Sequence, residues 1–296
     1  MDRKQALAIL TAGLTGCSNA PRLTVGAKNF TEQDILGEIL AAHLTNELHT
    51  KVSSRLHLGG SYLAHSALLS GDIDLYPEYS GTALTACLKL PLERDPAKVF
   101  ANVRAAYFQR HDVEWGWPLG FENTFAMVIP QKLGLRTLSE AVARKKDWRL
   151  AIGYEFEARA DGWPLFQKTY PLQLGAPLKT MDLGLLYRAL QSGDVDMAAG
   201  NTTDAALSTG AFTVLEDDLH FFPPYQTCLA VRRAALNAHA GLRPALDQLT
   251  GAISPELMRQ MNASVTQLKH EPAAVAQEFL RNWKAESGKT LPIDRR

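Results

Sequence analysis

Residues 70–84 read SGDIDLYPEYSGTAL, and residues 192–206 read SGDVDMAAGNTTDAA. In both stretches the pattern predicts that a helix ends at Ser-Gly-Asp, a short strand follows, and a Ser/Thr-rich turn opens another helix. Gly-Asp-Ile-Asp alone is a common helix-to-strand junction, but the starts of the two units also match: LTVGAKNFTE at 23–32 parallels LAIGYEFEAR at 150–159. The sequence therefore predicts two α/β units of the same order, placed side by side with a cleft between them.

The chain is expected to cross between these two lobes at turn-rich stretches around 115–120 and 222–225. The helices predicted after 225 are expected to pack back on the first lobe. This gives the following division: lobe 1 from 23–121 and 223–296, and lobe 2 from 122–222. Ligands of open α/β sheets bind at the carboxyl ends of strands, so the interlobe cleft is the expected site.

The start of the first unit carries the clearest local signals. Leu23–Gly26 reads as a strand, and Thr31 is predicted to cap the following helix with Asp34 as its capping-box partner. Apolar residues then recur at helical spacing between 35 and 44.

Residues 1–17, MDRKQALAILTAGLTGC, combine a basic start, a short apolar stretch and small residues before a cysteine. This order predicts an export signal, and its end resembles the bacterial lipobox, so Cys17 is the expected lipidation site. The alternative is a frayed helix with a chance cysteine. The protein is expected in the periplasm or on the outer face of the cell envelope. Cys87 and Cys228 either pair or stay free, and free thiols are the simpler interpretation.

Composition excludes several classes of protein. Lys plus Arg and Asp plus Glu both number 31, and the hydrophobic fraction of 46% is that of a globular protein rather than a disordered one. A nucleic-acid binder needs a basic excess, so no nucleic-acid partner is expected. No apolar run approaches the roughly 20 residues of a membrane span.

The residues expected at strand ends and helix-opening turns mix aromatic rings, hydroxyl and amide groups, and two cations. They are Lys28, Tyr79, Thr82, Asn123, Phe125, Arg159, Asn201 and Tyr225. No catalytic triad, phosphate loop or metal-ligand spacing is present, so we expect no catalysis, cofactor or metal. An enzyme would have to rely on Glu78, Glu155 and Asp204.

Aromatic faces attract quaternary ammonium groups, whereas a lysine, an arginine and a helix N-terminus near Thr82 suit a carboxylate. The set therefore indicates a zwitterion with a bulky cation. Each residue also has a simpler interpretation: Tyr79 and Tyr225 as packing aromatics, Lys28 as a solvated loop residue, and Arg159 as the helical partner of Glu155.

The chain resembles the substrate-binding proteins of glycine betaine/choline (quaternary amine, osmoprotectant) ABC importers. The motifs that carry the resemblance are VGAKNFTEQDILGEI at 25–39, LGGSYLAHSALLSGDIDLYPEYSGTA at 58–83, PLGFENTFAMVI at 118–129 and LEDDLHFFPPY at 215–225. The resemblance covers essentially the whole chain after the leader. It implies a hinged, two-lobed periplasmic-binding-protein fold of type II that closes on its ligand.

The resemblance also assigns roles to residues. Tyr79, Phe125 and Tyr225 fall on positions of the aromatic ammonium cage. The carboxylate and polar positions are Lys28, Thr82, Asn123 and Arg159. Asn201 stands where betaine binders have a further tyrosine, so the cage loses one wall. One cation–π contact contributes about 0.5–2 kcal/mol, so this loss weakens betaine binding by roughly tenfold.

The resulting expectation is a monomeric, lipid-anchored protein that delivers a quaternary amine or betaine-like zwitterion to an ABC permease. Glu78 either supports Lys28 or lies at the cleft edge. Two alternatives stay open: a binding protein for a different small polar amine, and a ligand-sensing module that docks a receptor.

Overall fold

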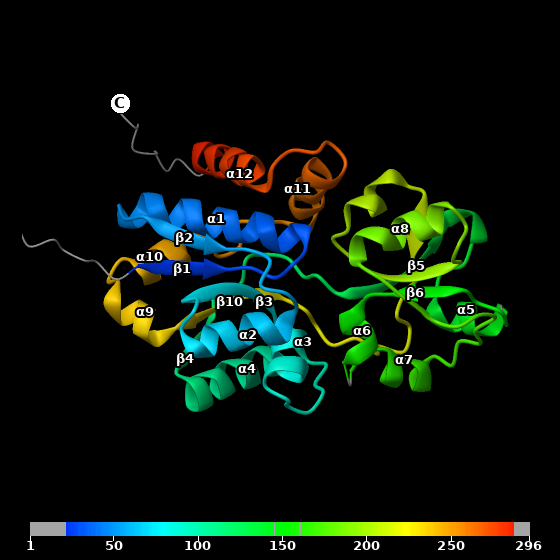
Figure 1. The fold of residues 1–296 in the computed structure, drawn as a ribbon. Coiled ribbons are helices and arrows are strands. Elements are labelled where there is room, and N and C mark those ends of the chain that lie inside the picture. Colours follow the sequence, from blue (N-terminus) through cyan, green and yellow to red (C-terminus); the bar gives the residue numbers. More distant parts are fainter. Residues whose placement is uncertain (1–21, 145, 160, 287–296) are drawn as a thin grey trace, which may run out of the picture.

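A computed structural model describes residues 22–144, 146–159 and 161–286. It contains two separate five-stranded sheets, each covered by helices, which lie side by side in Figure 1. We call the sheet of β1–β4 and β10, with its helices, lobe 1, and the sheet of β5–β9, with its helices, lobe 2. The predicted α/β class and two-lobed architecture are confirmed.

The strand order of lobe 1 is β2-β1-β3-β10-β4. Its strands are β1 (Leu23–Gly26), β2 (Val52–Arg55), β3 (Leu75–Tyr79), β4 (Val113–Gly116) and β10 (Thr227–Arg232). Its helices are α1 (Thr31–Leu48), α2 (Ser61–Ser70), α3 (Ser80–Thr82), the π-helical turn η1 (Ala83–Cys87) and α4 (Pro96–His111).

The strand order of lobe 2 is β7-β6-β8-β5-β9. Its strands are β5 (Phe125–Pro130), β6 (Leu150–Ile152), β7 (Lys179–Thr180), β8 (Met197–Asn201) and β9 (Phe212–Val214). Its helices are η2 (Gln131–Leu133), α5 (Leu138–Arg144), α6 (Tyr154–Ala158), α7 (Trp163–Thr169), α8 (Leu183–Gln191) and η3 (Ala205–Thr209).

The two sheets have the same topology. In each, the first strand of the unit lies between two parallel neighbours, β2 and β3 in lobe 1 and β7 and β8 in lobe 2. In each, the next strand is antiparallel and follows a crossing from the other lobe: β10 in lobe 1 and β5 in lobe 2. The predicted internal repeat is therefore confirmed. We keep the lobe limits at 121/122 and 222/223 as a proposal.

The repeated Ser-Gly-Asp stretch has the same structural role in both lobes: it ends a helix and fixes the start of the next strand. Gly71 and Gly193 follow α2 and α8 with φ of +84° and +75°, a left-handed conformation that glycine adopts without a steric penalty. Three residues further on, Asp74 accepts a hydrogen bond from the backbone N–H of Thr24 at 2.9 Å, and Asp196 accepts one from Arg149. Each aspartate thereby ties the start of its strand to the neighbouring parallel strand.

The C-terminal helices are α9 (Arg233–Ala238), α10 (Leu242–Asp247), α11 (Pro255–Thr266) and α12 (Pro272–Glu286). Their apolar residues share one core with β1 and α1, which confirms that this segment packs back on lobe 1. In Figure 1, α11 lies above the gap between the lobes, and it contacts both α1 and η3.

Two local predictions have clear outcomes. The predicted cap at Thr31 is wrong, because α1 begins at Thr31 with Phe30 as its N-cap and no side-chain cap bond forms. The side chain of Gln33 instead turns back and accepts from the backbone N–H of Lys28 at 3.2 Å. Cys87 and Cys228 are both free thiols.

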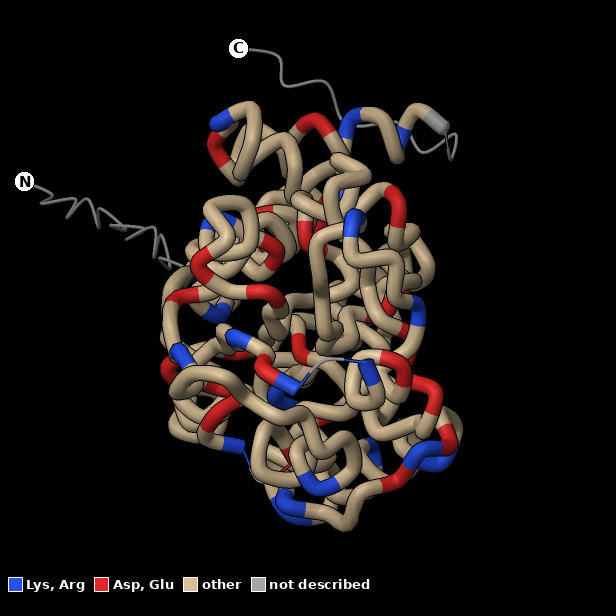
Figure 2. The backbone as a smooth tube through the Cα atoms, turned by 90° about the vertical axis from the view of Figure 1, so that its right-hand side faces the viewer, with Lys and Arg blue, Asp and Glu red and all other residues tan. Residues whose placement is uncertain are grey.

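The predicted export signal and the lipidation site Cys17 lie outside the described residues. Within the described part of the chain, no helix has the length and apolar character needed to cross a membrane. Basic and acidic residues are interspersed along the backbone in the view of Figure 2.

Candidate functional site

Polar contacts join the two lobes where their strands end. Ser61 at the start of α2 donates to Glu155 of α6 through its hydroxyl at 3.2 Å, and its backbone N–H contacts the same carboxylate. On the α11 side, the Asn262 amide donates to the carbonyl oxygen of Thr203 at 2.9 Å. Side chains of both lobes therefore share one buried region.

Arg159 follows α6 and is 1% exposed. Its guanidinium forms a bidentate pair with Asp161, with N–O distances of 2.9 and 2.6 Å. It also reaches into lobe 1, donating to Thr82 at 3.0 Å and to Thr85 at 3.1 Å. The alternative that Arg159 pairs with Glu155 is wrong.

Phe125 and Tyr225 form an aromatic corner beside this arginine. Their rings meet edge to face at 5.7 Å, and the Arg159 guanidinium carbon lies 5.4 Å from the Phe125 ring centre. Tyr225 is buried, and its hydroxyl is without a hydrogen-bond partner among the described residues. Burial raises the pKa of Tyr225 well above its ordinary value, so the phenol stays neutral and is able to donate.

Lys28 lies two residues after the end of β1 and is buried, so the solvated-loop interpretation is wrong. Its ammonium pairs with Glu78 at 2.6 Å and donates to Ser61 at 3.2 Å. It also lies 4.5 Å from the centre of the Tyr79 ring, a cation–π distance. The role left open for Glu78 is thereby settled: it supports Lys28.

Tyr79, the last residue of β3, connects this ammonium to a second carboxylate. Its ring stacks on Phe30 at 6.4 Å, and its hydroxyl donates to Glu32 at 2.6 Å. Glu32 also accepts from the amides of Asn123 at 2.8 Å and Asn262 at 3.2 Å. Burial raises the pKa of Glu32, while the hydrogen bonds donated to its carboxylate act in the opposite direction.

Asn201 ends β8 at the position that corresponds to Tyr79 in lobe 1, and it lies opposite Phe125 in the sheet register. Its backbone N–H donates to Asp204 at 2.7 Å, and Tyr187 donates to the same carboxylate at 2.8 Å. Removal from water raises the pKa of Asp204 to about 6.

Three buried polar atoms of this region are without a partner among the described residues: the Tyr225 hydroxyl and the amide oxygens of Asn123 and Asn262. Glu32 only accepts hydrogen bonds when it is ionised, so both amides must present their NH2 groups to it and keep their oxygens free. Buried polar groups without partners are costly, so these three atoms are available to a polar ligand or to water between the lobes.

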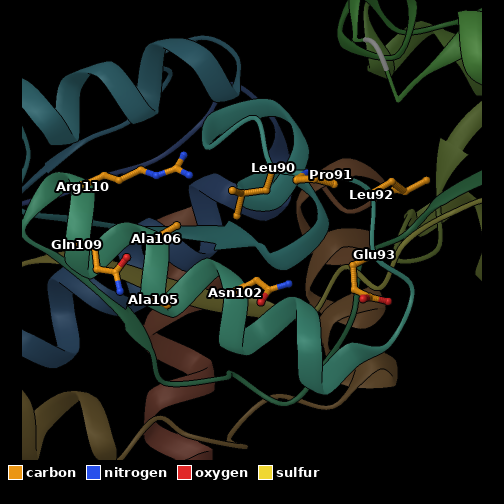
Figure 3. A pocket seen from close by; sticks show the side chains of 9 residues that line it. All are labelled: Leu90, Pro91, Leu92, Glu93, Asn102, Ala105, Ala106, Gln109 and Arg110. Carbon is orange, nitrogen blue, oxygen red and sulfur yellow. The ribbon is translucent and has the colours of Figure 1, made fainter.

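A surface pocket lined by Leu90–Glu93 and the face of α4 is separate from this region. In Figure 3 the loop and the helix face each other across it. None of the residues nominated for ligand contact lines this pocket.

Comparison with known proteins decides the family. The family described as "Substrate binding domain of ABC-type glycine betaine transport system" matches residues 21–282. The chain belongs to this family. It is therefore a substrate-binding protein of the glycine betaine class of ABC transport systems, and the family consists of extracytoplasmic transport proteins rather than enzymes.

The sequences of individual relatives align with most of this chain. The carnitine transport binding protein OpuCC of Listeria monocytogenes serotype 1/2a (strain 10403S) is 32% identical over 282 residues, covering 93% of this chain and 91% of its own length. The ergothioneine transport permease/ergothioneine binding protein EgtU of Helicobacter pylori (strain G27) is 33% identical over 87% of this chain, but over only 47% of its own length.

A solved crystal structure, of a glycine betaine/carnitine/choline ABC transporter, is also similar. It superposes with a TM-score of 0.75 at 31% identity, covering 88% of this chain and 98% of that one. The predicted resemblance and the type II binding fold are thereby confirmed.

Glu32 and Asn262 were not identified from the sequence; they are two buried polar residues whose hydrogen bonds connect Tyr79, Asn123 and Thr203. A signal for both was available in the helical period. Glu32 lies three and four residues before Ile35 and Leu36, and Asn262 lies four after Met258, so each polar residue is on a buried face. Polar residues on such faces need partners, and here they partner each other.

Proposed function

We propose that this chain captures a quaternary amine or betaine-like zwitterion between its lobes and delivers it to an ABC permease, without catalysing a reaction. The unpartnered Tyr225 hydroxyl, held between Phe125 and Arg159, is the observation that carries the proposal. It is a neutral donor beside a cation and an aromatic face, which suits a ligand with both a carboxylate and an alkylated ammonium.

In this proposal the ammonium cage consists of Tyr79, Phe125, Tyr225 and Asn201. The carboxylate and other polar groups of the ligand contact Lys28, Thr82, Asn123 and Arg159. Arg159 retains a role because its bonds to Asp161, Thr82 and Thr85 use four of its five N–H groups. Ligand binding favours the closed form, in which the lobes present one joint surface to the permease.

The proposal includes attachment to the membrane by lipidation of Cys17, action as a monomer, and a location in the periplasm or on the outer face of the envelope. The order of residues 1–17 supports the anchor. Mass spectrometry of the membrane fraction tests it: a lipid adduct on a mature chain beginning at Cys17 is expected, and a chain that keeps residues 1–16 contradicts it.

A different small polar amine is the second candidate, and Asn201 favours it, because an amide at this wall adds hydrogen-bonding groups where a ring would add only a π face. The relative named for ergothioneine supports testing that compound beside the betaines.

Thermal unfolding of the purified protein tests both candidates. The panel is glycine betaine, proline betaine, choline, carnitine, ergothioneine and unrelated amino acids. A ligand at about 100 times its Kd adds about 2.7 kcal/mol and raises Tm by several degrees.

The Tyr225→Phe variant should lose most of that shift while folding normally, because only an unpartnered hydroxyl is removed. A panel in which no alkylated amine moves Tm, while another amino acid does, contradicts the proposed function. Mass spectrometry of the released ligand tests for chemistry: the ligand should leave unchanged.

A further inference from the structure

The buried region between the lobes holds unequal numbers of acidic and basic groups. Its two buried cations each have a carboxylate of their own: Lys28 pairs with Glu78 at 2.6 Å, and Arg159 pairs with Asp161 at 2.6 Å. Glu32 is a third carboxylate, 2% exposed. Over residues 22–144, 146–159 and 161–286, no lysine, arginine or histidine forms an ion pair with it.

The partners of Glu32 are neutral donors. One carboxylate oxygen accepts from Tyr79 and Asn123, and the other accepts from Asn262. Donors on both oxygens favour the ionised form, but they do not cancel its charge. A buried carboxylate without a counter-ion is costly, and the cost falls when a cation is brought near it.

The position of Glu32 relative to the proposed cage completes the argument. Its oxygen is 2.6 Å from the Tyr79 hydroxyl, so a ligand cation beside the hydroxyl end of the Tyr79 ring lies near the carboxylate, whereas the Lys28 ammonium lies 4.5 Å from the ring centre. Asp204 lies close enough to Glu32 for their charges to interact, which adds to the negative potential at this end of the cleft. The free amide oxygens of Asn123 and Asn262 are also on this side.

We propose that Glu32 is the counter-charge for the ligand's cationic group, so that this chain selects a cation over a neutral group of the same shape by charge as well as by its aromatic rings. The inference rests on the proposed function, and it names Glu32 as a specificity-determining residue of that site.

Two matched pairs of ligands isolate the charge. Choline is compared with 3,3-dimethyl-1-butanol, and glycine betaine with 3,3-dimethylbutanoate; in each pair a carbon replaces the ammonium nitrogen. Affinities are measured by calorimetry on the full chain. For the wild type, we expect the charged member of a pair to bind at least tenfold more tightly.

The variants separate Glu32 from the cage. Glu32→Gln should reduce the ratio within each pair by roughly tenfold, because the charge is lost while the shape is kept. Glu32→Asp keeps the charge and should retain most of the ratio, even where both affinities fall. Glu278→Gln, an exposed position on α12, is the matched control and should leave the ratio unchanged.

A second measurement needs no substitution at Glu32. Neither member of the choline pair titrates, so their ratio should fall as the pH is lowered and Glu32 takes up a proton. The pKa of Asp204 is also raised, to about 6, so the measurement is repeated in Asp204→Asn, where the fall should persist.

The outcomes are distinct. A wild-type ratio near one overturns the inference, as does a ratio that responds neither to Glu32→Gln nor to pH, while the proposed function stands because the amines still bind. If neither choline nor glycine betaine binds the wild type, the inference fails, and the full panel of alkylated amines decides separately whether the proposed function fails.

Discussion

The two lobes have the same sheet order but end their central strands differently. In lobe 1, β3 ends at Tyr79 and is followed three residues later by Thr82; in lobe 2, β8 ends at Asn201 and is followed by Asp204 at the same spacing. The Ser-Gly-Asp turns that precede both strands are equivalent. The repeat therefore fixes where the strands end, and the residues placed at those ends differ with the task of each lobe.

The difference is one of chemistry. The lobe 1 end offers an aromatic ring whose hydroxyl is bound by Glu32, and the lobe 2 end offers an amide whose backbone is bound by Asp204. Each strand end is thus fixed by a carboxylate, but only one of them presents a π face. Substitutions that exchange or remove these features test the comparison.

The largest effect on stability and ligand binding is expected at Arg159, a residue of lobe 2 whose guanidinium donates hydrogen bonds to Thr82 and Thr85 of lobe 1. Arg159→Leu leaves Asp161 without its cation and removes the contacts to Thr82 and Thr85, so it should lower the free energy of unfolding by about 3–5 kcal/mol and abolish ligand binding. Urea unfolding and calorimetry measure the two effects.

Arg149→Leu is the control. The side chain of Arg149 is 45% exposed, so its pair with Asp196 is screened by solvent and the expected loss is about 1 kcal/mol, with binding intact. If both variants lose the same free energy of unfolding, the Arg159–Asp161 ion pair contributes no more to stability than a pair at the surface.

The next effect concerns pH and Asp204. Its pKa is about 6 in the folded protein and ordinarily about 3.8, so the folded state holds this proton more tightly. The stability that the proton contributes is fully present below pH 4 and is lost as pH rises through 6. Asp204→Asn should remove about 2–3 kcal/mol of that decline, measured by urea unfolding between pH 4 and 7.

Asp34 in lobe 1 also has a pKa near 6, so Asp34→Asn accounts for part of the remaining slope. If the slope of Asp204→Asn matches that of the wild type, the strand end of lobe 2 is not held by a buried carboxyl group.

A smaller effect is expected from making the strand ends alike. Asn201→Tyr adds an aromatic ring at the position of lobe 2 that corresponds to Tyr79. It should tighten glycine betaine binding by roughly tenfold, because it adds one cation–π contact. The reverse substitution, Tyr79→Asn, should weaken it by more, because the hydroxyl bond to Glu32 is lost as well. Weaker betaine binding by Asn201→Tyr would mean that the asparagine itself contacts the ligand.

The smallest effect on stability is expected at the aspartates that follow the equivalent turns of the two lobes. Asp74→Asn and Asp196→Asn each weaken hydrogen bonds that tie two parallel strands, so each should cost about 1 kcal/mol of folding free energy. The two losses should agree within about 0.5 kcal/mol, as measured by urea unfolding. A loss confined to one of them would contradict the structural equivalence of the turns.

Features that depend on neighbouring residues were predictable from the sequence. The strand at Leu23–Gly26, the repeated turn chemistry at Gly71 and Gly193, and the position of Tyr79 and Asn201 at strand ends all follow from local patterns. The helix cap was not predictable in the same way. Phe30 is the N-cap of α1 without a side-chain cap bond, and its ring stacks on Tyr79, 49 residues further along the chain.

The partners of the buried charged residues could not be predicted from the sequence either, because they also come from distant segments. The spacing of Arg159 suited Glu155 on a helix, but α6 ends at Ala158, and the guanidinium pairs with Asp161 instead. Glu32 was visible as a carboxylate on an apolar face, but its convergence with Asn123 and Asn262 joins segments 91 and 230 residues away.

The sequence by itself determined the repeat, the α/β class, the strand-end residues and, through its motifs, the family, because these depend on local turn chemistry and on side-chain periodicity. The tertiary structure alone decided which charges are paired and which are left over. Ion pairing depends on distances of a few ångströms between segments far apart in the chain, and no local pattern fixes those distances. The pairing of Lys28 with Glu78 and of Arg159 with Asp161, and the lack of an ion-pair partner for Glu32 among the described residues, are properties of the folded chain.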